Sequence, residues 1–464
     1  MPLFQFFSLF QLWWCLFFFL PFAIKGASAR ASISVGLPVL YLLAMFASGN
    51  SMLPWQRLVV STAGLLYALK SALLFKLPCK ELSEYSKIGL LLFMSVWPGF
   101  DLDAFAAKCE RSETDSAAEN EVARQFVRGY TRFGAGLILS LVVAFYAADV
   151  PKVFLGYLGI AALLLIIHFG YAEMLAAVLR LSGWAVTPLF KDPFASTSLN
   201  DFWSHRWNLA FVEMDRRLFV PVLRTRLTKV QTFFAVFVVS GVLHELAVSF
   251  SCGSGWGGPL LYFIVQAAGV LIERKVKPRA LVGKVWTYTW LFLPLPLLFQ
   301  HAFRGVFIVP PYMALHSELM TLSLPGLISL ALWCAGVGHF CTLGAGLQVP
   351  FRLKWKEELA RLSPFNAKIF LNYAAYVGLT IIAFGVMTLV EHDELMRGGK
   401  EARCLTAFIT IFWSVRLLVD RFYFKDDEWP QGPLIIIGHA FLNTLFVCLT
   451  GTYAVLLLWQ TVLH

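Results

Sequence analysis

The sequence predicts an all-α, polytopic integral membrane protein with about 10–12 transmembrane helices. Of its 464 residues, 58% are hydrophobic and only 14% are charged, against roughly a quarter charged in an ordinary soluble domain. A soluble chain of this composition could not cover its surface with polar groups, so lipid must surround most of it. The composition therefore excludes an ordinary cytosolic enzyme, a disordered scaffold and a nucleic-acid-binding domain.

Long uncharged blocks indicate that the spans are helices and not barrel strands. A spanning helix needs about 20 mostly apolar residues, whereas an outer-membrane strand is an alternating segment of roughly 10 residues. The uncharged blocks are 2–24, 31–56, 246–272, 319–351, 369–390 and 431–464. Each of them has the length of a helical span.

The first apolar run, residues 4–20, has no Lys or Arg before it. It is also longer than the apolar core of about 7–15 residues that a secretory signal carries. We therefore expect an uncleaved first span and not a cleaved signal.

Further spans are expected where an apolar run is bounded by charged or helix-breaking residues. They are 31–48, 58–75, 133–148, 153–171, 233–250, 260–272, 285–303, 319–346, 369–390, 405–419 and 435–459. A shorter apolar stretch, 88–97, ends at Trp97-Pro98-Gly99, a breaker that stops a helix at the membrane surface. Charged residues gather at 350–368, which predicts a boundary between a core, residues 1–350, and a C-terminal transmembrane module of unknown role, residues 351–464.

The net charge of +10 comes from cations gathered in short loops. This pattern indicates cytoplasmic segments that face anionic headgroups, and not nucleic acid. The eight cysteines are scattered without a CxxC pair, so neither a disulfide framework nor a metal site is predicted.

Residues 191–229 are aromatic, basic and too charged to span a membrane. Apolar residues recur there at Phe211, Met214, Leu218 and Val222, the spacing of one helical face. Such an amphipathic helix lies in the membrane interface and does not cross the bilayer. A plain amphipathic linker between spans is the alternative.

The most informative ionisable residues are His244 and Glu245, in the run Ser240-Gly241-Val242-Leu243-His244-Glu245. They interrupt a largely apolar segment, and ionisable residues inside a membrane helix are functional candidates by default. A desolvated imidazole stays uncharged at pH 7 and can accept a proton. A packing histidine bonded to a backbone carbonyl is the alternative.

A second group precedes the amphipathic helix, in the run Asn200-Asp201-Phe202-Trp203-Ser204-His205-Arg206-Trp207-Asn208. Asp201 can cap a helix N-terminus, and Trp203 and Trp207 suit the headgroup layer. Taken alone, this group also fits an aromatic membrane anchor.

Together the two runs resemble the membrane-bound O-acyltransferase (MBOAT) family, in particular its wax-synthase-like branch. That branch has a stretch like Asp201-Phe202-Trp203-x-x-Arg206-Trp207-Asn208, followed by a Ser-Gly-x-x-His-Glu stretch like residues 240–245. His244 follows Asn208 by 36 residues, a gap usual for the branch. Trp97-Pro98-Gly99 with Asp101 is similar to an upstream motif of some relatives, although Asp101 stands one residue further along. The resemblance covers roughly residues 90–350.

The resemblance implies an MBOAT-like fold and transfer of an acyl group from a thioester, usually acyl-CoA, to a hydroxyl, with no other cofactor. It also implies that His244 is catalytic and that Asn208 is its partner. The chemistry agrees, because a neutral imidazole can take the proton of an attacking alcohol. A carboxamide can orient the donor or stabilise the developing oxyanion.

Residues around this pair are expected to bind substrate: Asp201, Trp203, Arg206, Trp207 and Glu245. Arg206, Arg216 and Arg217 are placed for the phosphates of CoA, although a headgroup-binding face explains them equally well. Glu245 either sets the tautomer of His244 or pairs with a buried donor. Two later histidines, His316 and His339, have no acid directly after them, and we expect both to be structural.

The leading interpretation is a multi-pass acyl-CoA:alcohol O-acyltransferase, similar to a wax synthase, in the bacterial cytoplasmic membrane or the eukaryotic endoplasmic reticulum. Its partners would be acyl-CoA, a lipophilic alcohol and membrane lipids, and not nucleic acid. A glycan or metabolite acceptor stays open. So do a non-catalytic membrane scaffold and a proton-coupled transporter in which His244 and Glu245 form a proton relay. The sequence has no evident internal repeat, which is a usual sign of transporters.

Overall fold

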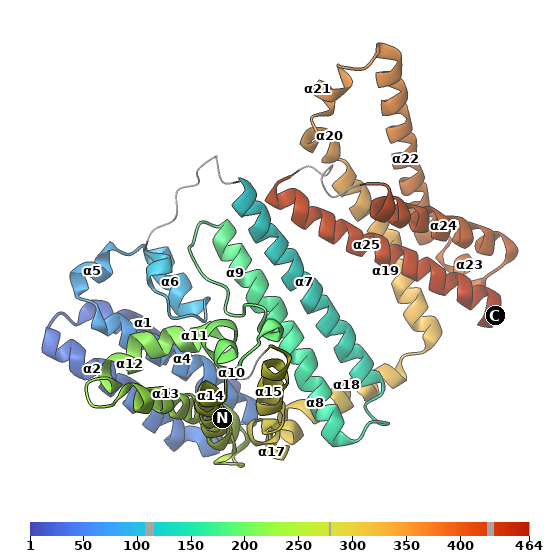
Figure 1. The fold of residues 1–464 in the computed structure, drawn as a ribbon. Coiled ribbons are helices and arrows are strands. Elements are labelled where there is room, and N and C mark those ends of the chain that lie inside the picture. The colour runs from blue at the N-terminus through green and yellow to red at the C-terminus, as the bar shows by residue number, and fades with distance from the viewer. Residues whose placement is uncertain (107–115, 278–279, 425–430, 464) are drawn as a thin grey trace. The chain divides into compact units, whose positions relative to one another are not determined.

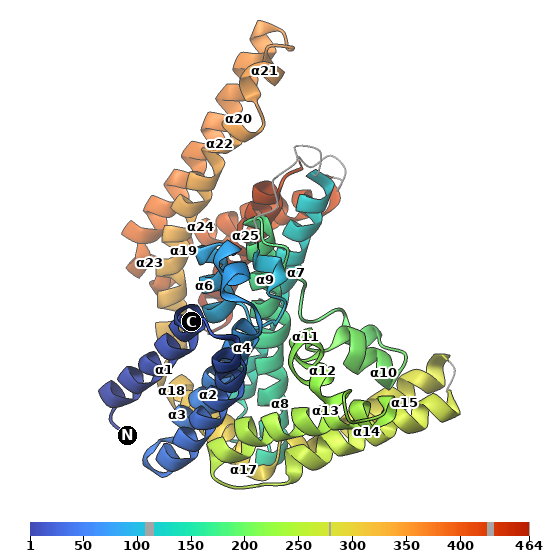
Figure 2. The same ribbon diagram turned by 90° about the vertical axis from the view of Figure 1, so that its left-hand side faces the viewer.

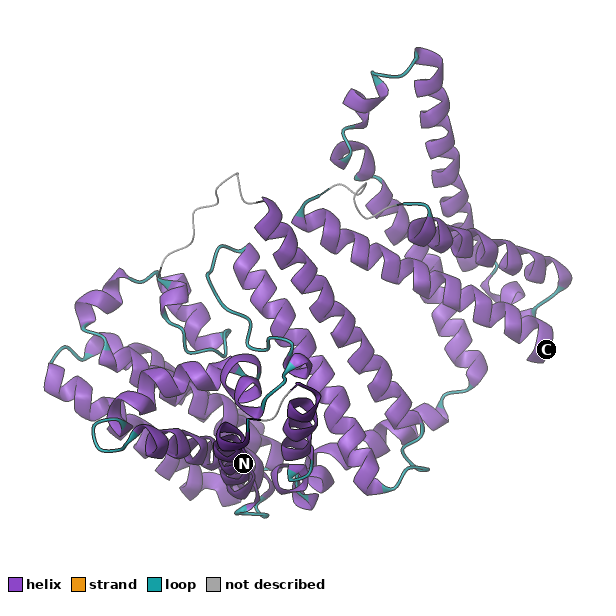
Figure 3. Cartoon of the chain, in the orientation of Figure 1, coloured by secondary structure: helices purple, strands orange, loops and turns teal. Residues whose placement is uncertain are grey.

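The computed structural model describes residues 1–106, 116–277, 280–424 and 431–463, and over these ranges every regular element is a helix (Figures 1 and 3). Eleven helical stretches in the described ranges are long and apolar enough to cross a membrane. The prediction of an all-α integral membrane protein with multiple passes is confirmed.

The candidate spans follow one another in chain order, and some consist of two helices in succession. They are α1 (Leu3–Ala23), α2 (Ala27–Ser48), α3 (Pro54–Val59) with α4 (Leu65–Lys76), α7 (Ser116–Phe145), α8 (Lys152–Leu163) with α9 (Ala172–Leu181), α13 (Lys229–His244), α15 (Ala280–Phe292) with α16 (Leu295–Leu298), α19 (Leu324–Gly346) with α20 (Val349–Arg352), α22 (Pro364–Val390), α24 (Lys400–Phe422) and α25 (Pro433–Leu458). The other helices are α5 (Cys79–Glu84), α6 (Lys87–Ser95), α10 (Leu199–Asp201), α11 (Leu209–Met214), α12 (Val220–Leu223), α14 (Gly258–Val276), α17 (His301–Phe303), α18 (Val309–Thr321), α21 (Trp355–Leu359) and α23 (His392–Arg397).

Local sequence signals set where these helices begin. At α13, the side chain of Thr228 accepts from the backbone N–H of Gln231. The side-chain oxygen of Gln231 accepts in turn from the backbone N–H of Thr228. This reciprocal capping box satisfies donors that a helix start leaves free. At α22, Ser363 caps the helix and Pro364 occupies its first position, where the missing N–H of proline does no harm.

The chain divides into two compact units. Unit 1 comprises Met1–Asp115 and Arg128–His316, and unit 2 comprises Ser116–Val127 and Ser317–His464. The predicted division after residue 350 falls within unit 2. It stays a prediction, because a compact unit and a family core need not coincide.

Unit 1 contains the segments that carry both sequence motifs. One cluster of buried side chains joins α1, α2, α4 and α6 to the helical run that begins at α11. A second cluster joins α10, α13, α14 and α15. α13 and α14 lie side by side (Figure 2), and Gly241 of α13 permits the close approach, since a Cβ there would be 2.8 Å from Leu260.

Two buried basic side chains of unit 1 bond backbone carbonyls and not carboxylates. The Arg30 guanidinium donates to the carbonyls of Ile24 at 2.7 Å and of Leu74 and Leu77 at 2.9 and 2.6 Å. Lys70 is fully buried, and its Nζ donates to the carbonyl of Phe93 at 2.5 Å and to that of Trp97. Both side chains thus bond carbonyls at or near the ends of helices.

The predicted amphipathic helix forms a continuous helical run over 209–223, made of α11, a π-helical segment (Asp215–Phe219) and α12. Met214 and Leu218 are buried, whereas Val222 is 64% exposed. The apolar stripe is therefore covered by protein only over its first part. The run is not among the candidate spans.

Unit 2 is built on α19, α22, α24 and α25, whose core includes Phe384, Trp413, Phe446 and Tyr453. His339 lies fully inside this core, with Nε2 3.0 Å from the Tyr453 hydroxyl. The position is that of a packing histidine.

Candidate active site

His244 is the last residue of α13, and a π-helical segment (Glu245–Phe250) continues the helix after it. Its Nδ1 lies 2.7 Å from the carbonyl oxygen of Ser240, four residues earlier. A carbonyl only accepts hydrogen bonds, so Nδ1 carries the proton and Nε2 keeps a free lone pair. The fold therefore holds His244 in the tautomer that can act as a base through Nε2.

Aromatic rings pack on the His244 imidazole. The ring centroid of Phe263, on α14, is 4.4 Å away, and that of Phe211, on α11, is 5.3 Å away. Two helices far apart in sequence thus fix the orientation of the imidazole.

Asn208 is the residue directly before α11, with φ of 41° and ψ of 64°. This is the left-handed region, which asparagine tolerates better than most residues but which still carries backbone strain. Its side chain makes no capping hydrogen bond to the helix. The strained backbone therefore presents a carboxamide that does not cap α11.

Two cavities adjoin this pair. The first, of about 270 Å³, is lined by Ser204, Asp215 and Arg216 together with the aromatic rings of Trp203 and Trp207. The second, of about 360 Å³, is mainly apolar and includes Leu65, Leu66, Leu69, Pro98 and Phe100. Asn208, Phe211 and His244 line both cavities. The structure thus brings the two predicted catalytic residues together where the cavities meet.

Glu245 points elsewhere. Its Oε1 accepts from the backbone N–H groups of Gly257 and Leu260, at 2.9 and 3.0 Å, and so caps the N-terminus of α14. Glu245 lines neither cavity. The sequence left two roles open for Glu245. Its contacts match the second role, that of a carboxylate paired with buried donors.

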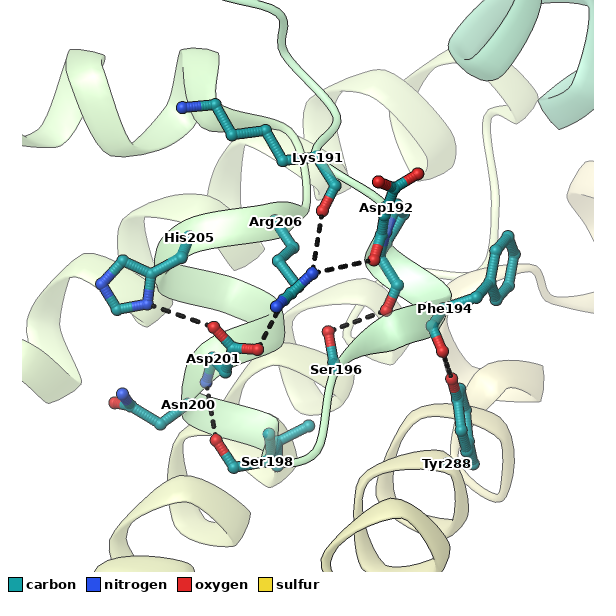
Figure 4. Close-up of polar contacts among 12 residues, drawn as sticks. Lys191, Asp192, Phe194, Ser196, Ser198, Asn200, Asp201, His205, Arg206 and Tyr288 are labelled. Carbon is teal, nitrogen blue, oxygen red and sulfur yellow. Dashed lines mark hydrogen bonds and ion pairs between the residues drawn. The ribbon is translucent and has the colours of Figure 1, made fainter. Parts of the chain in front are cut away.

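The predicted binding residues Asp201 and Arg206 form an ion pair with each other (Figure 4). Arg206 Nε is 2.5 Å from Asp201 Oδ2, and its Nη1 also donates to the carbonyls of Lys191 and Asp192, at 3.4 and 3.3 Å. Neither residue lines the two cavities. Their contacts instead fix the turn from which Asn208 projects.

The cap that we expected at Asp201 is wrong, because Ser198 is the N-cap of α10 (Figure 4). The Ser198 hydroxyl accepts from the backbone N–H of Asp201 at 3.0 Å. Asp201 is the third residue of that helix, and its carboxylate faces Arg206 and His205, the latter at 3.5 Å. An N-cap Ser three residues before an acid is a common helix start.

Trp203 and Trp207 line the first cavity as parts of an aromatic cluster. Trp203 donates from Nε1 to Gln266 on α14, at 3.2 Å. Trp207 stacks on Phe202 and on His168, with centroids 5.2 and 6.2 Å apart. His168 comes from the α8–α9 span, and its Nδ1 is buried without a partner among the described residues.

The loop at Trp97-Pro98-Gly99 forms part of the second cavity's wall. Glu213 Oε2 accepts from the backbone N–H groups of Phe100 and Asp101, at 2.8 and 3.2 Å, while Lys70 bonds the Trp97 carbonyl from the other side. Burial raises the pKa of the Glu213 carboxyl. The loop is therefore fixed between the buried side chain of Lys70 and the half-buried carboxyl of Glu213.

Arg217 connects the same loop to the amphipathic run. It bonds Asp101 at 2.5 Å and Asp103 at 2.8 Å, and the hydrogen bond from Arg217 lowers the pKa of Asp103. Of the three arginines considered for phosphate binding, Arg206 and Arg217 are thus paired with carboxylates. Arg216 lines the first cavity.

Sequence reasoning missed Asp215 and Glu213. Asp215 lies seven residues after Asn208, and a spacing of seven places both on one helical face, so the spacing could have found it. Nothing in the sequence indicates the contact of Glu213 with a loop 113 residues earlier.

Comparison with known proteins shows which family this site resembles. Residues 186–265, which contain both predicted catalytic residues, match the model of the membrane bound O-acyl transferase family. The chain resembles this family, in its wax-synthase-like branch. The predicted resemblance is thus confirmed.

Three curated relatives match part of the chain. Acyl-CoA–sterol O-acyltransferase 1 of Arabidopsis thaliana is 32% identical over 150 residues, which are 26% of this chain and 42% of the relative. Probable long-chain-alcohol O-fatty-acyltransferase 6 of the same plant is 32% identical over 25% of this chain and 40% of the relative. Long-chain-alcohol O-fatty-acyltransferase of Simmondsia chinensis is 28% identical over 24% and 39%. The chain spans about two fifths of the length of these relatives.

Proposed function

We propose that this protein is a membrane-embedded O-acyltransferase that moves a fatty acyl group from acyl-CoA to the hydroxyl of a lipophilic alcohol. The observation that carries this proposal is that His244 and Asn208 line both cavities. A transferase needs its reacting pair where two substrates meet, and here a cavity with polar residues adjoins an apolar one.

His244 is the general base in the proposed reaction. Its Nε2 takes the proton of the alcohol as the oxygen attacks the thioester carbonyl, which forms the new C–O bond. The Asn208 carboxamide donates a hydrogen bond to the oxyanion that develops. The C–S bond then breaks, and the imidazolium returns its proton to the leaving thiolate, so that the products are an ester and free CoA.

The two cavities suit the two substrates. Arg216 is the cation of the first cavity, and arginine is well suited to phosphate, so we assign this side to the donor. The leucines and Phe100 of the second cavity suit a hydrocarbon chain. The names of these three relatives, as O-acyltransferases of a sterol or a long-chain alcohol, support the same class of acceptor.

The test is an acyl-transfer assay with the full chain in membranes. Radiolabelled long-chain acyl-CoA is supplied with a long-chain alcohol, a sterol, a glycan or no acceptor, and labelled esters and free CoA are quantified. We expect an ester with one of the two lipophilic acceptors and an equal amount of CoA. Transfer to the glycan alone would show a different acceptor class, and a failure to form any ester would contradict the proposal.

A further inference from the structure

Asp215 lines the first cavity but takes no part in the steps above. Phe211, Val212 and Asp215 of the helical run 209–223 line this cavity together with Asn208, which directly precedes the run, and their spacing is that of one helical face. At 1.5 Å per residue, Asp215 lies about 10 Å from Asn208 along the helix axis. Asp215 therefore lines the cavity at a distance from the proposed reacting pair.

The carboxyl of Asp215 has an unmet hydrogen-bonding need. Its Oδ1 is buried and has no partner among the residues that the structure describes. No ion pair joins it to Arg216 within those residues, although the two are adjacent in sequence and line the same cavity. An unpaired buried oxygen is destabilising, and a ligand that supplies the partner removes this penalty.

Burial raises the pKa of Asp215 from 3.8 to about 7, so both protonation states are populated near neutral pH. The neutral carboxyl donates and accepts hydrogen bonds, whereas the ionised form only accepts. A phosphate would be repelled by the ionised form, and an alkyl chain would leave either form unpaired. The suitable partner is a neutral group that offers both a donor and an acceptor, which means an amide or a hydroxyl.

We propose that Asp215 hydrogen-bonds an amide of the pantetheine arm of the acyl donor. That arm carries its amides between the thioester and the phosphates, so a bond at Asp215 would direct the thioester toward Asn208 and His244. This inference rests on the proposed function and extends it to one donor-binding residue. Asp215 acts on donor binding and not on the chemical step.

Other charged groups near Asp215 determine how the test must be designed. Arg216 and His244 line the same cavity, and Lys76 of α4 donates to the backbone carbonyls of Arg217 and Leu218, at 2.9 and 3.3 Å. Because His244 lines the same cavity and is the proposed base, binding is measured in a variant that lacks this imidazole, which also prevents turnover of the donor.

The experiment measures equilibrium binding of a labelled long-chain acyl-CoA to the full-length His244→Ala variant in detergent. Three substitutions are each added to this parent. Asp215→Leu has a similar shape but no polar atom, and Asp215→Asn keeps a donor and an acceptor. Asp149→Leu is the control, at an exposed position that lines neither cavity. We expect Asp215→Leu to weaken binding roughly tenfold, and the other two to bind like the parent. The elution volume and melting temperature of each variant show whether it is folded.

The pH profile supplies a readout that a structural role would not produce. Binding to the parent should weaken as the pH rises from 6 to 8, because the ionised carboxylate repels the CoA phosphates and no longer donates. The Asp215→Asn variant should lack this part of the pH dependence. Parallel profiles for the two proteins would overturn the inference.

Steady-state kinetics, measured in protein that keeps His244, distinguish whether the group that bonds Asp215 belongs to the acyl donor or to the alcohol. Asp215→Leu should raise KM for acyl-CoA and leave kcat and KM for the alcohol unchanged. A rise in KM for the alcohol alone would assign Asp215 to the acceptor hydroxyl and overturn the inference.

If the parent binds acyl-CoA and Asp215→Leu binds it equally well, only the Asp215 inference fails. If the parent binds no acyl-CoA at all, the proposed function itself fails.

Discussion

His244 donates its Nδ1–H to the carbonyl oxygen of Ser240, with 2.7 Å between the two atoms. A packing histidine also makes such a bond to a backbone carbonyl. The same bond leaves Nε2 unprotonated, so that it can act as a base. The two interpretations of His244 that the sequence left open therefore share one geometry, and only activity measurements separate them.

The first prediction concerns this imidazole. We expect His244→Ala to lower ester formation by at least about 10²-fold, since general-base catalysis typically contributes that much, while the protein still accumulates in the membrane. The matched control is His316→Ala. Nδ1 of His316 also bonds backbone carbonyls, those of Ala144 and Phe145, at 3.0 Å, but it lines neither cavity. Full ester formation by His244→Ala would eliminate the proposed base.

The second prediction separates the carboxamide of Asn208 from its backbone conformation. Asn208→Gly removes the amide but suits the positive φ, whereas Asn208→Ala removes the amide and strains the backbone by about 1 kcal/mol. We expect both variants to lose about 10²-fold in turnover and only the alanine variant to melt at a lower temperature. Normal turnover in Asn208→Gly would mean that the amide has no role in transfer.

The third prediction is a pH dependence of stability. Because burial raises the pKa of Asp215 to about 7, the folded protein holds a proton between pH 4 and 7 that the unfolded chain has released. Stability should therefore rise as the pH falls from 8 to 5, by at most about 1.4 kcal/mol per pH unit. Melting temperatures in detergent measure this slope. Asp215→Asn should flatten it, and an unchanged slope would show that Asp215 is not its source.

The fourth prediction concerns the loop between Lys70 and Glu213. Glu213→Ala leaves the N–H groups of Phe100 and Asp101 unpaired, which should cost about 1–3 kcal/mol and change which alcohol chain lengths are accepted. Glu213→Gln keeps an acceptor oxygen and removes a buried charge, so it should melt near the wild-type temperature. Melting curves and product profiles with alcohols of graded length measure both effects. An unaltered profile for Glu213→Ala would show that the loop does not select the acceptor.

The fifth prediction tests the alternatives for Glu245. A glutamine at this position still accepts from Gly257 and Leu260, so Glu245→Gln should keep most of the transferase activity. Glu245→Ala removes the cap of α14 and should lower stability by roughly 1 kcal/mol. If Glu245→Gln were as inactive as His244→Ala, the carboxylate would be required for the chemistry of the imidazole.

The all-helical, multi-pass architecture follows from the sequence because lipid imposes a length and an apolar character on each span. The meeting of Asn208 with His244 was predicted from two short motifs and not from periodicity. The role of Asp201 was mistaken because Ser198 competes for the same cap and stands three residues earlier. The bonds of Lys70 and Glu213 to the loop near Trp97 join distant parts of the chain, and no local pattern in the sequence specifies them.

The rings of Phe211 and Phe263 that flank His244 have a consequence for wasteful hydrolysis. A thioester held beside a base is open to attack by water as well as by alcohol. Water entering between these rings would give up most of its hydrogen bonds, whereas a fatty alcohol would arrive with its tail already sheltered. In the proposed reaction, the same two rings that orient the imidazole would therefore protect the activated acyl group until an acceptor is present.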